Sequence, residues 1–372
     1  MKITHVETYP VRIPLKPARH MVTALGRHTE SSYLLVRVGT DAGVEGVGEA
    51  TVMPIWSGET VWGARALVER VLAPLLTGAD PRDIDDVNRR LDRGTRHNWF
   101  AKAALEMACW DVRGKAEGRP VYELLGGAAR PLAVRCRFSM GAYEPDRARA
   151  RARELVAEGF DTIKVKVGGA PRDDEARVRA VREAIGPDRA LTIDANCGWD
   201  VNTAIACVRA LDDCRIALNE QPTPDGDYEG LARVRRETKP PVMADDICFD
   251  LAHARELVRN ACCDVISVYP GKNGGISKSR AVAEFAARHG VACSIGSNLE
   301  WDVGTAAMAH LVVATPNMRV EDYPGDMLGP EYHEVRIARE PLAINGPVVT
   351  VSDRPGLGVE VDWPVVREHL IT

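Results

Sequence analysis

Hydrophobic and polar residues follow two different patterns along this chain, and the change comes near residue 130. In the first part, β-branched or alternating runs predict antiparallel strands at residues 2–14, 32–39 and 43–50. We therefore expect an α+β unit over residues 1–125, which ends just before Gly126-Gly127. Runs with helical periodicity complete this unit, at residues 60–75, 83–91 and 100–117.

In the second part, short apolar runs alternate with amphipathic stretches, which is typical of parallel βαβ units. Repeats of this length and number favour a closed barrel over a doubly wound sheet, so we assign residues 126–332 to a barrel. The tail, residues 333–372, is strand-like and rich in Gly and Pro, and we expect it to pack back on the first unit. The apolar runs predict eight strands, at residues 133–139, 161–167, 190–194, 216–220, 241–245, 264–268, 291–295 and 318–322. The amphipathic stretches predict helices between them, among others at residues 146–158, 173–185, 200–213, 250–259, 276–288 and 302–313.

Charge and cysteine content narrow the class of protein. The chain has 372 residues, and 48 basic against 53 acidic residues give a net charge of −5, so there is no excess of positive charge for a nucleic-acid partner. No run of about 18 apolar residues occurs, so we expect no membrane span. The N-terminus has no apolar signal segment. The nine cysteines form no CxxC pair, which favours free thiols in a reducing cytoplasm.

Charged residues stand where the predicted barrel strands end. The second strand ends in Lys164-Val-Lys166, and the next three end in Asp194, Glu220 and Asp245, at intervals of 28 (194−166), 26 (220−194) and 25 (245−220) residues. The carboxyl ends of barrel strands meet at one mouth, where the active sites of such barrels lie. Three carboxylates there repel one another, so the simplest interpretation is a hard divalent cation, Mg²⁺. Any single one of these acids could instead be a helix N-cap, but the regular spacing favours the metal.

The two lysines are two residues apart on a strand, so both side chains point to the same face. If that face is the barrel interior, each ammonium disfavours the charge on the other, which lowers a pKa toward neutrality and makes a general base. The alternative is an outward-facing, solvated pair beside Ile163, Val165 and Val167.

Several short motifs occur together in one order along nearly the whole chain, and in that order the sequence resembles the enolase superfamily, and within it the mandelate racemase/muconate lactonizing enzyme group. The motifs of the first unit are Gly48-Glu49-Ala50, Ala101 to Ala108 followed by Trp110-Asp111, and Glu123 to Gly127. Those of the barrel are Lys164-x-Lys166, Asp194-x-Asn196, Glu220-Gln-Pro222, Ala244-Asp245, Gly274-Gly275-Ile276, Glu300 and Gly304-Thr-Ala-Ala.

The resemblance implies a modified TIM barrel, (β/α)7β, with an N-terminal α+β capping domain. It implies Mg²⁺ on Asp194, Glu220 and Asp245, and removal of the proton α to the carboxylate of a small substrate by Lys166, assisted by Lys164. It further implies a homo-oligomer. Residues of the capping loops and of the barrel motifs are then candidate substrate contacts, although simple loop packing explains the loop residues equally well: Trp56, Glu59, His20, His28, Asn196, Lys272 and Glu300.

The sequence departs from the resemblance at the sixth strand. Enzymes of the muconate lactonizing type carry a second lysine there, and the corresponding residue is Tyr269. The other arrangement of the family is a His–Asp dyad with its histidine on the seventh strand. The sequence does not match it, because Cys293 to Asn298 contain no histidine. A tyrosine with its ordinary pKa of about 10 is protonated at neutral pH, so Tyr269 can donate a proton or form a pocket wall, but it is a poor base.

One base and one acid suit the elimination of water. We therefore expect a Mg²⁺-dependent lyase, most simply a dehydratase of a small hydroxy acid or hydroxy amino acid such as cis-3-hydroxy-L-proline. The alternatives are a cycloisomerase or a racemase/epimerase of the muconate lactonizing type. A different class, a non-catalytic barrel protein, is supported only by the missing lysine.

Overall fold

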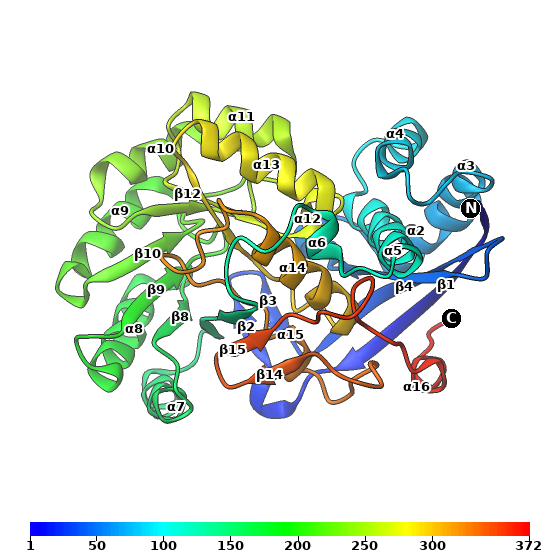
Figure 1. Ribbon diagram of the computed structural model, residues 1–372. Coiled ribbons are helices and arrows are strands. Elements are labelled where there is room, and N and C mark those ends of the chain that lie inside the picture. Colours follow the sequence, from blue (N-terminus) through cyan, green and yellow to red (C-terminus); the bar gives the residue numbers. More distant parts are fainter.

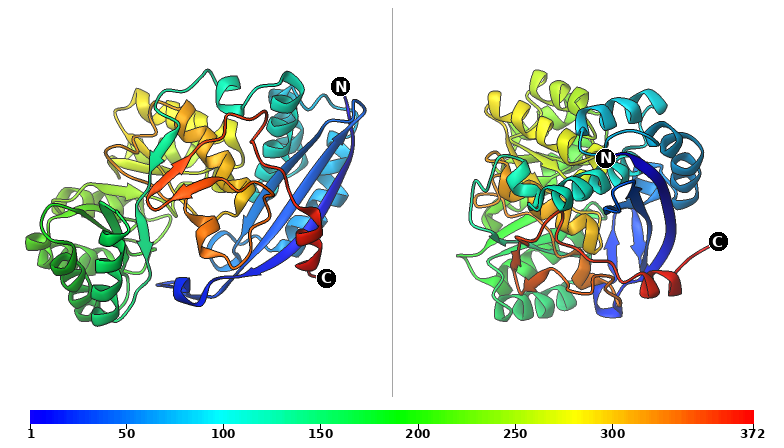
Figure 2. Two further views of the ribbon diagram at one scale, coloured as in Figure 1. Left: turned by 60° about the horizontal axis from the view of Figure 1, so that its bottom comes forward. Right: turned by 45° about the vertical axis from the view of Figure 1, so that its right-hand side comes forward.

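The computed structural model describes residues 1–372 and places two units side by side, a barrel and a smaller α+β capping domain (Figure 1). The N- and C-termini both lie on the side of the capping domain (Figure 2). No helix combines the length and the apolar character needed to cross a membrane.

The capping domain is built on a three-stranded antiparallel sheet in the order β1-β4-β5. Helix α5 packs closely on this sheet at Gly48, where a Cβ atom would lie 1.8 Å from the carbonyl oxygen of Ala104. A small hairpin that the sequence pattern did not predict, β2 with β3, carries His28. The strands are β1 (Ile3–Pro14), β2 (Met21–Thr23), β3 (Gly26–His28), β4 (Glu30–Thr40) and β5 (Glu45–Val52). The helices are α1 (Pro54–Ser57), α2 (Val61–Leu67), α3 (Ala73–Leu76), α4 (Ile84–Gly94), α5 (Trp99–Glu117) and α6 (Val121–Leu124), with a π-helical turn (Val68–Leu72) between α2 and α3.

The barrel contains seven parallel strands in the order β13-β12-β11-β10-β9-β8-β7. Neighbours in this order are also neighbours in the sequence, as expected when each strand is followed by a helix that returns the chain to the same end. The strands are β7 (Phe138–Met140), β8 (Thr162–Lys166), β9 (Ala190–Asp194), β10 (Ile216–Glu220), β11 (Val242–Ala244), β12 (Val265–Val268) and β13 (Ala292–Ile295). The helices are α7 (Pro145–Ala157), α8 (Pro171–Ile185), α9 (Val201–Ala210), α10 (Tyr228–Glu237), α11 (Leu251–Arg259), α12 (Pro270–Asn273), α13 (Ile276–Arg288) and α14 (Asp302–Ala314).

The prediction of a strand at residues 318–322 is wrong. Only Met318 forms a bridge, to Cys293, and the chain then turns because the amide of Tyr323 donates to the carbonyl of Arg319 (2.8 Å). This irregular segment still bridges the two edge strands: the amide of Arg319 donates to Cys293 (2.7 Å) and that of Arg137 to Gly325 (2.8 Å). The result is the (β/α)7β barrel, in which the last strand position is filled by a loop.

The strand predicted at residues 133–139 is divided into two strands of different sheets. Its first part, β6 (Ala133–Arg135), pairs antiparallel with β15 (Val348–Thr350) of the tail. Only its second part, β7, belongs to the barrel. The tail therefore contacts both units, since its last residues also lie along β1, where Leu370 pairs with Val11. Its other elements are β14 (Ala343–Asn345) and α16 (Trp363–Glu368), and α15 (Gly329–Tyr332) directly precedes the tail.

Candidate active site

A pocket of ≈ 90 Å³ lies at the carboxyl ends of the barrel strands, where loops of the capping domain meet the barrel. Seven residues singled out from the sequence line it: Lys164, Lys166, Asn196, Asp245 and Tyr269 from the barrel, and His28 and Trp56 from the capping domain. The other lining residues are Met21, Thr23, Leu25, Met53, Arg137, Ser139, Ser297, Asn298, Leu299 and Asp326.

Both lysines of strand β8 point into the barrel, as predicted, and contact carboxylates of the next two strands. The Nζ atom of Lys164 lies 2.6 Å from Oε1 of Glu220 and 2.8 Å from Oδ2 of Asp194. The Nζ atom of Lys166 lies 2.5 Å from the same Asp194 oxygen and 2.6 Å from Oδ1 of Asn196. Strand register explains this arrangement, because Asp194 is opposite Lys166 on one side and Glu220 on the other.

The carboxylates reverse the pKa shift that we expected for Lys164. Burial and the neighbouring Arg137 lower its pKa, but Asp194 and Glu220 offset both, so its pKa is raised. Burial would raise the pKa of Asp194, but the two lysines hold it well below its usual range. The pKa of Glu220 is raised, because burial and the repulsion from Asp194 and Asp245 exceed the effect of Lys164. The expectation from the sequence was wrong because it considered the two lysines without the carboxylates that contact them.

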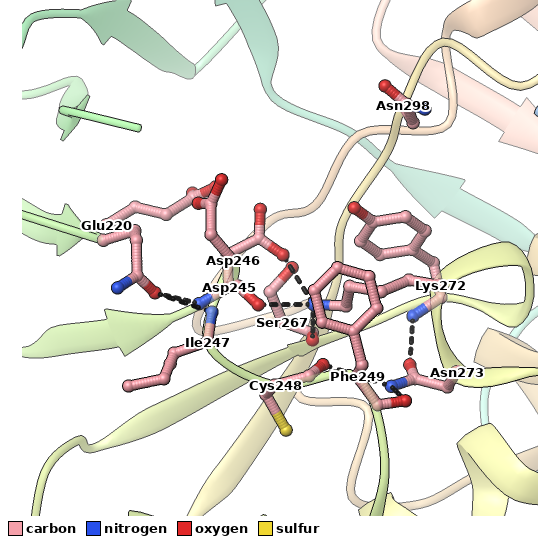
Figure 3. A network of polar contacts seen from close by, with 12 residues as sticks. Glu220, Asp245, Asp246, Ile247, Cys248, Phe249, Ser267, Lys272, Asn273 and Asn298 are labelled. Carbon is pink, nitrogen blue, oxygen red and sulfur yellow. Dashed lines mark hydrogen bonds and ion pairs between the residues drawn. The ribbon is translucent and has the colours of Figure 1, made fainter. Parts of the chain in front are cut away.

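The third carboxylate, Asp245, follows strand β11 and is held by Lys272 from α12 (Figure 3). The Nζ atom of Lys272 donates to Oδ1 of Asp245 (2.6 Å), to its carbonyl (2.9 Å) and to the carbonyl of Ser267 (2.8 Å). Lys272 is fully buried and does not line the pocket. Gln221 fixes the same turn, because its Oε1 accepts from the amide of Asp245 (2.9 Å).

The donor set fits a hard divalent cation. Asp194, Glu220 and Asp245 end or directly follow adjacent strands and offer carboxylate oxygens, the donors that Mg²⁺ prefers. The next residue, Asp246, has a buried Oδ2 with no partner, and burial together with Asp245 and Asp194 raises its pKa to about 7, which marks an excess of negative charge here. No three His, Cys, Asp or Glu side chains converge closely enough to form a ready metal cluster. Lys164 lies between two of the three carboxylates instead, so it would have to release them to a metal.

Tyr269 lies between an aromatic ring and a cation. Its ring stacks on Trp56 of α1, with centroids 5.9 Å apart, and the Nζ atom of Lys272 lies 4.7 Å from the ring centroid. Burial and the nearby acids, Asp245 first, raise the pKa of Tyr269 well above 10. Tyr269 is therefore protonated at neutral pH, and its hydroxyl makes no hydrogen bond within the protein. Trp56 also joins the two units, since its indole nitrogen donates to Oδ1 of Asp246 (2.6 Å).

Three other residues predicted to contact substrate do not line the pocket. Glu59 accepts from the amides of Phe100 (3.0 Å) and Ala101 (3.1 Å) at the start of α5, so it caps a helix. Glu300 accepts from the Ser297 hydroxyl (2.8 Å) and the Asn298 amide (3.0 Å) within its own loop. The third, His20, ends a short turn before β2. Glu59 and Glu300 are therefore buried hydrogen-bond acceptors with a structural role.

The sequence reasoning missed Arg137 and Asp326, which line the pocket. Arg137 is one of two arginines in the predicted strand 133–139, and alternation places it and Arg135 on one face, which was a usable signal. Asp326 follows the segment that was wrongly predicted as a strand. Backbone strain also marks the site. Of the eight non-glycine residues with positive φ, four lie in the loops after barrel strands β9, β10 and β13, where such strain is typical of function: Asn196 (42°), Cys197 (65°), Gln221 (34°) and Leu299 (60°).

Comparisons with known proteins agree with this architecture. Residues 3–126 match the family model described as "Mandelate racemase / muconate lactonizing enzyme, N-terminal domain", and residues 147–365 match "Enolase C-terminal domain-like". Muconate cycloisomerase 1 of Rhodococcus opacus is 34% identical over 379 residues, which cover 99% of this chain and 98% of that protein. Cis-3-hydroxy-L-proline dehydratase of Roseibium aggregatum is 32% identical over 375 residues, covering 99% and 98%.

Among solved structures, a dipeptide epimerase from Enterococcus faecalis in complex with Mg and a dipeptide superimposes with a TM-score of 0.92 at 32% identity, covering 97% of this chain and 100% of that one. Further relatives are named as racemases and epimerases, so similarity alone does not select one reaction. Family models that match most of the chain, and relatives above 30% identity along nearly its whole length, establish the class. The chain belongs to the mandelate racemase/muconate lactonizing enzyme family and is an enzyme of the enolase superfamily.

Proposed function

We propose that this enzyme is a Mg²⁺-dependent dehydratase, which removes water from a small carboxylate with a hydroxyl on the β-carbon. Lys166 is the base and Tyr269 is the acid. The observation that carries the proposal is that a lysine amine and a protonated, unbonded tyrosine hydroxyl line the same small pocket. A base and an acid together are what β-elimination of a poor leaving group requires.

Asp194, Glu220 and Asp245 would hold the cation, which when bound supplies positive charge to stabilise the negative charge that develops on the substrate carboxylate. Lys166, in its neutral form, takes the α-proton, and the electron pair of that bond spreads into the carboxylate. When the pair returns to form the Cα=Cβ bond, the bond from Cβ to its hydroxyl breaks, and the hydroxyl leaves as water with the proton of Tyr269. Solvent exchange then returns a proton to Tyr269 and removes one from Lys166.

Pocket size and charge support a small substrate, and an amino acid in particular. A volume of ≈ 90 Å³ is smaller than that of the pockets that bind drug-sized ligands. Lys164 and Arg137 supply positive charge for a carboxylate, whereas Asp326 supplies a negative charge for an amine. These features, together with the similarity to a protein named as a cis-3-hydroxy-L-proline dehydratase, support that compound as the first candidate.

Cycloisomerisation is the second candidate, because a single base is sufficient for it and a muconate cycloisomerase is 34% identical. Reversible epimerisation is less well supported. It needs a group on the second face that both gives and takes a proton, and the raised pKa of Tyr269 makes this side chain a donor only.

Proton exchange in D₂O tests the proposal. The protein is incubated with Mg²⁺ and a panel of carboxylates, including cis-3-hydroxy-L-proline, muconate and dipeptides, and both α-deuterium and products are followed by NMR. We expect exchange and loss of water with the hydroxy amino acid. The variant Tyr269→Phe should keep the exchange and lose the elimination. Lactone formed from muconate without loss of water would support the second candidate, and an epimer formed as fast as deuterium enters would contradict both.

Two further expectations accompany this proposal. All nine cysteines are free thiols, and eight of them are buried, which supports a reducing compartment such as the cytoplasm. A homo-oligomer stays a prediction, and light scattering of the purified protein tests it.

A further inference from the structure

A buried arginine stands inside the barrel, next to the proposed metal site. Arg137 directly precedes strand β7 and is only 1% exposed. An arginine in this position is costly to bury unless its charge and its donors are matched. Its contacts therefore indicate what it does.

The guanidinium is fixed between two parts of the barrel. Its Nη2 atom donates to Oε2 of Glu220 (3.0 Å), and its Nη1 atom donates to the carbonyl of Pro324 (3.0 Å) in the segment that closes the barrel. The backbone amide of Arg137 also donates to Gly325 of that segment (2.8 Å). Because it is anchored on both sides, the guanidinium cannot turn away from Glu220 without losing a buried hydrogen bond.

The two oxygens of Glu220 consequently differ in their partners. Oε1 is contacted by Lys164, whose only other partner is Asp194, so a cation that binds these two acids can displace the lysine from both. Oε2 is contacted by Arg137, whose other anchor holds it in place. A cation that approaches Glu220 can therefore gain Oε1 by displacing the lysine, whereas Oε2 stays hydrogen-bonded to the arginine.

We propose that Arg137 is a positioning residue that restricts Glu220 to one metal-binding oxygen and thereby sets a preference for Mg²⁺ over Ca²⁺. Mg²⁺ takes six ligands in a near-ideal octahedron, in which a carboxylate supplies a single oxygen. Ca²⁺ takes six to eight oxygens and commonly binds both oxygens of a carboxylate. The inference rests on the proposed function in one respect, that a divalent cation binds to these three acids.

Calorimetric titration of the full chain with MgCl₂ and with CaCl₂ tests this role without any substrate. In Arg137→Met, the ratio of Ca²⁺ to Mg²⁺ affinity should rise about tenfold over the wild type, because Glu220 can then offer both oxygens. Arg137→Lys retains a cationic donor beside Oε2, so it should keep the ratio near that of the wild type. Arg130→Met is the matched control. Arg130 has a side chain that is 8% exposed, donates to the carbonyl of Thr315 and pairs with Glu321 (2.7 Å), away from the metal ligands, and its loss should leave the ratio unchanged.

The possible outcomes separate the two proposals. If the wild type binds neither ion, the metal site of the proposed function is wrong. If it binds them, and Arg137→Met weakens both by the same factor, Arg137 has only a structural role and the inference is overturned. Thermal unfolding of each variant comes first, and if Arg137→Met does not fold, Arg137→Leu provides the same test, because it also has no donor for Oε2.

Discussion

Buried carboxylates occur in two regions of this molecule, and their partners differ. At the barrel mouth, Asp194, Glu220 and Asp245 are matched by lysine and arginine side chains. Where the capping domain meets the barrel, two acids of the capping domain are matched by backbone amides. We call Glu49 and Glu106 the interface carboxylates.

Each interface carboxylate caps a barrel helix. Glu49 of β5 accepts from the amides of Trp301 (2.6 Å) and Gly304 (3.0 Å) at the start of α14. Glu106 of α5 accepts from Ile276 (2.8 Å) and Ser277 (2.9 Å) at the start of α13. A backbone amide at a helix N-terminus cannot move away, whereas a lysine can change partner. Burial of an acid is therefore no sign of chemistry by itself, and the partners of the acid have to be considered with it.

The largest expected effect is on the barrel mouth. Lys166→Met removes the proposed base but retains a side chain of similar length, so α-proton exchange should fall by about 10³-fold while thermal stability stays close to that of the wild type. NMR in D₂O and thermal unfolding measure the two quantities. A variant that keeps wild-type exchange would show that another residue is the base.

The opposite pattern is expected for an interface carboxylate. Glu106→Ala leaves the buried amides of Ile276 and Ser277 without their acceptor and removes one of the two acceptors of the Trp110 indole N–H, which should cost about 4 kcal/mol of unfolding free energy. Urea unfolding measures this loss. The control is Glu284→Ala, where an exposed ion pair with Arg280 is removed and the change should stay below about 0.5 kcal/mol. A loss of less than about 1 kcal/mol at Glu106 would contradict the distinction between the two regions.

The sequence predicted the layout of the barrel mouth because that layout is periodic. Each βα repeat returns the chain to the same end, so the intervals between Lys166, Asp194, Glu220 and Asp245 placed their backbones correctly. The exception is the position of the eighth strand, where a β-branched run at residues 318–322 folds into a turn and pairs only at Met318.

The partners of the buried acids could not be predicted in the same way, because they come from distant parts of the chain. Glu59 was a candidate substrate contact, yet the amide that it caps is Phe100, 41 residues away. Arg137 and Glu220 are 83 residues apart and meet only when the barrel closes. Sequence spacing gives the position of an acid along a strand, whereas its donor is selected by packing.

The two regions should also respond differently to pH. Burial raises the pKa of Glu49 to about 7 against its usual 4.5, although the amides of Gly304 and Trp301 oppose the rise. A group whose pKa is raised in the folded state stabilises it fully below pH 4.5, and this contribution is lost as pH rises toward 7. Glu49→Gln does not titrate. The stability of the wild type relative to this variant should therefore fall by up to about 3 kcal/mol between pH 4.5 and 8, as measured by urea unfolding at each pH. A difference that does not change with pH would mean that the pKa of Glu49 is not raised in the folded state.

The smallest expected effect concerns Trp56, which joins the two regions. It belongs to the capping domain, but its indole nitrogen donates to Asp246 of the barrel (2.6 Å) and its ring stacks on Tyr269. Trp56→Phe keeps an aromatic ring over Tyr269 and loses only the hydrogen bond, so we expect a loss of about 1 kcal/mol, or roughly a fivefold rise in KM with little change in kcat. Steady-state kinetics with the substrate that the enzyme dehydrates measures both constants. Trp56→Ala, which also loses the stacked ring, should raise KM further. A fall in kcat at unchanged KM would mean that the bond to Asp246 acts in the transition state, and the capping domain would then contribute to the chemistry as well as to binding.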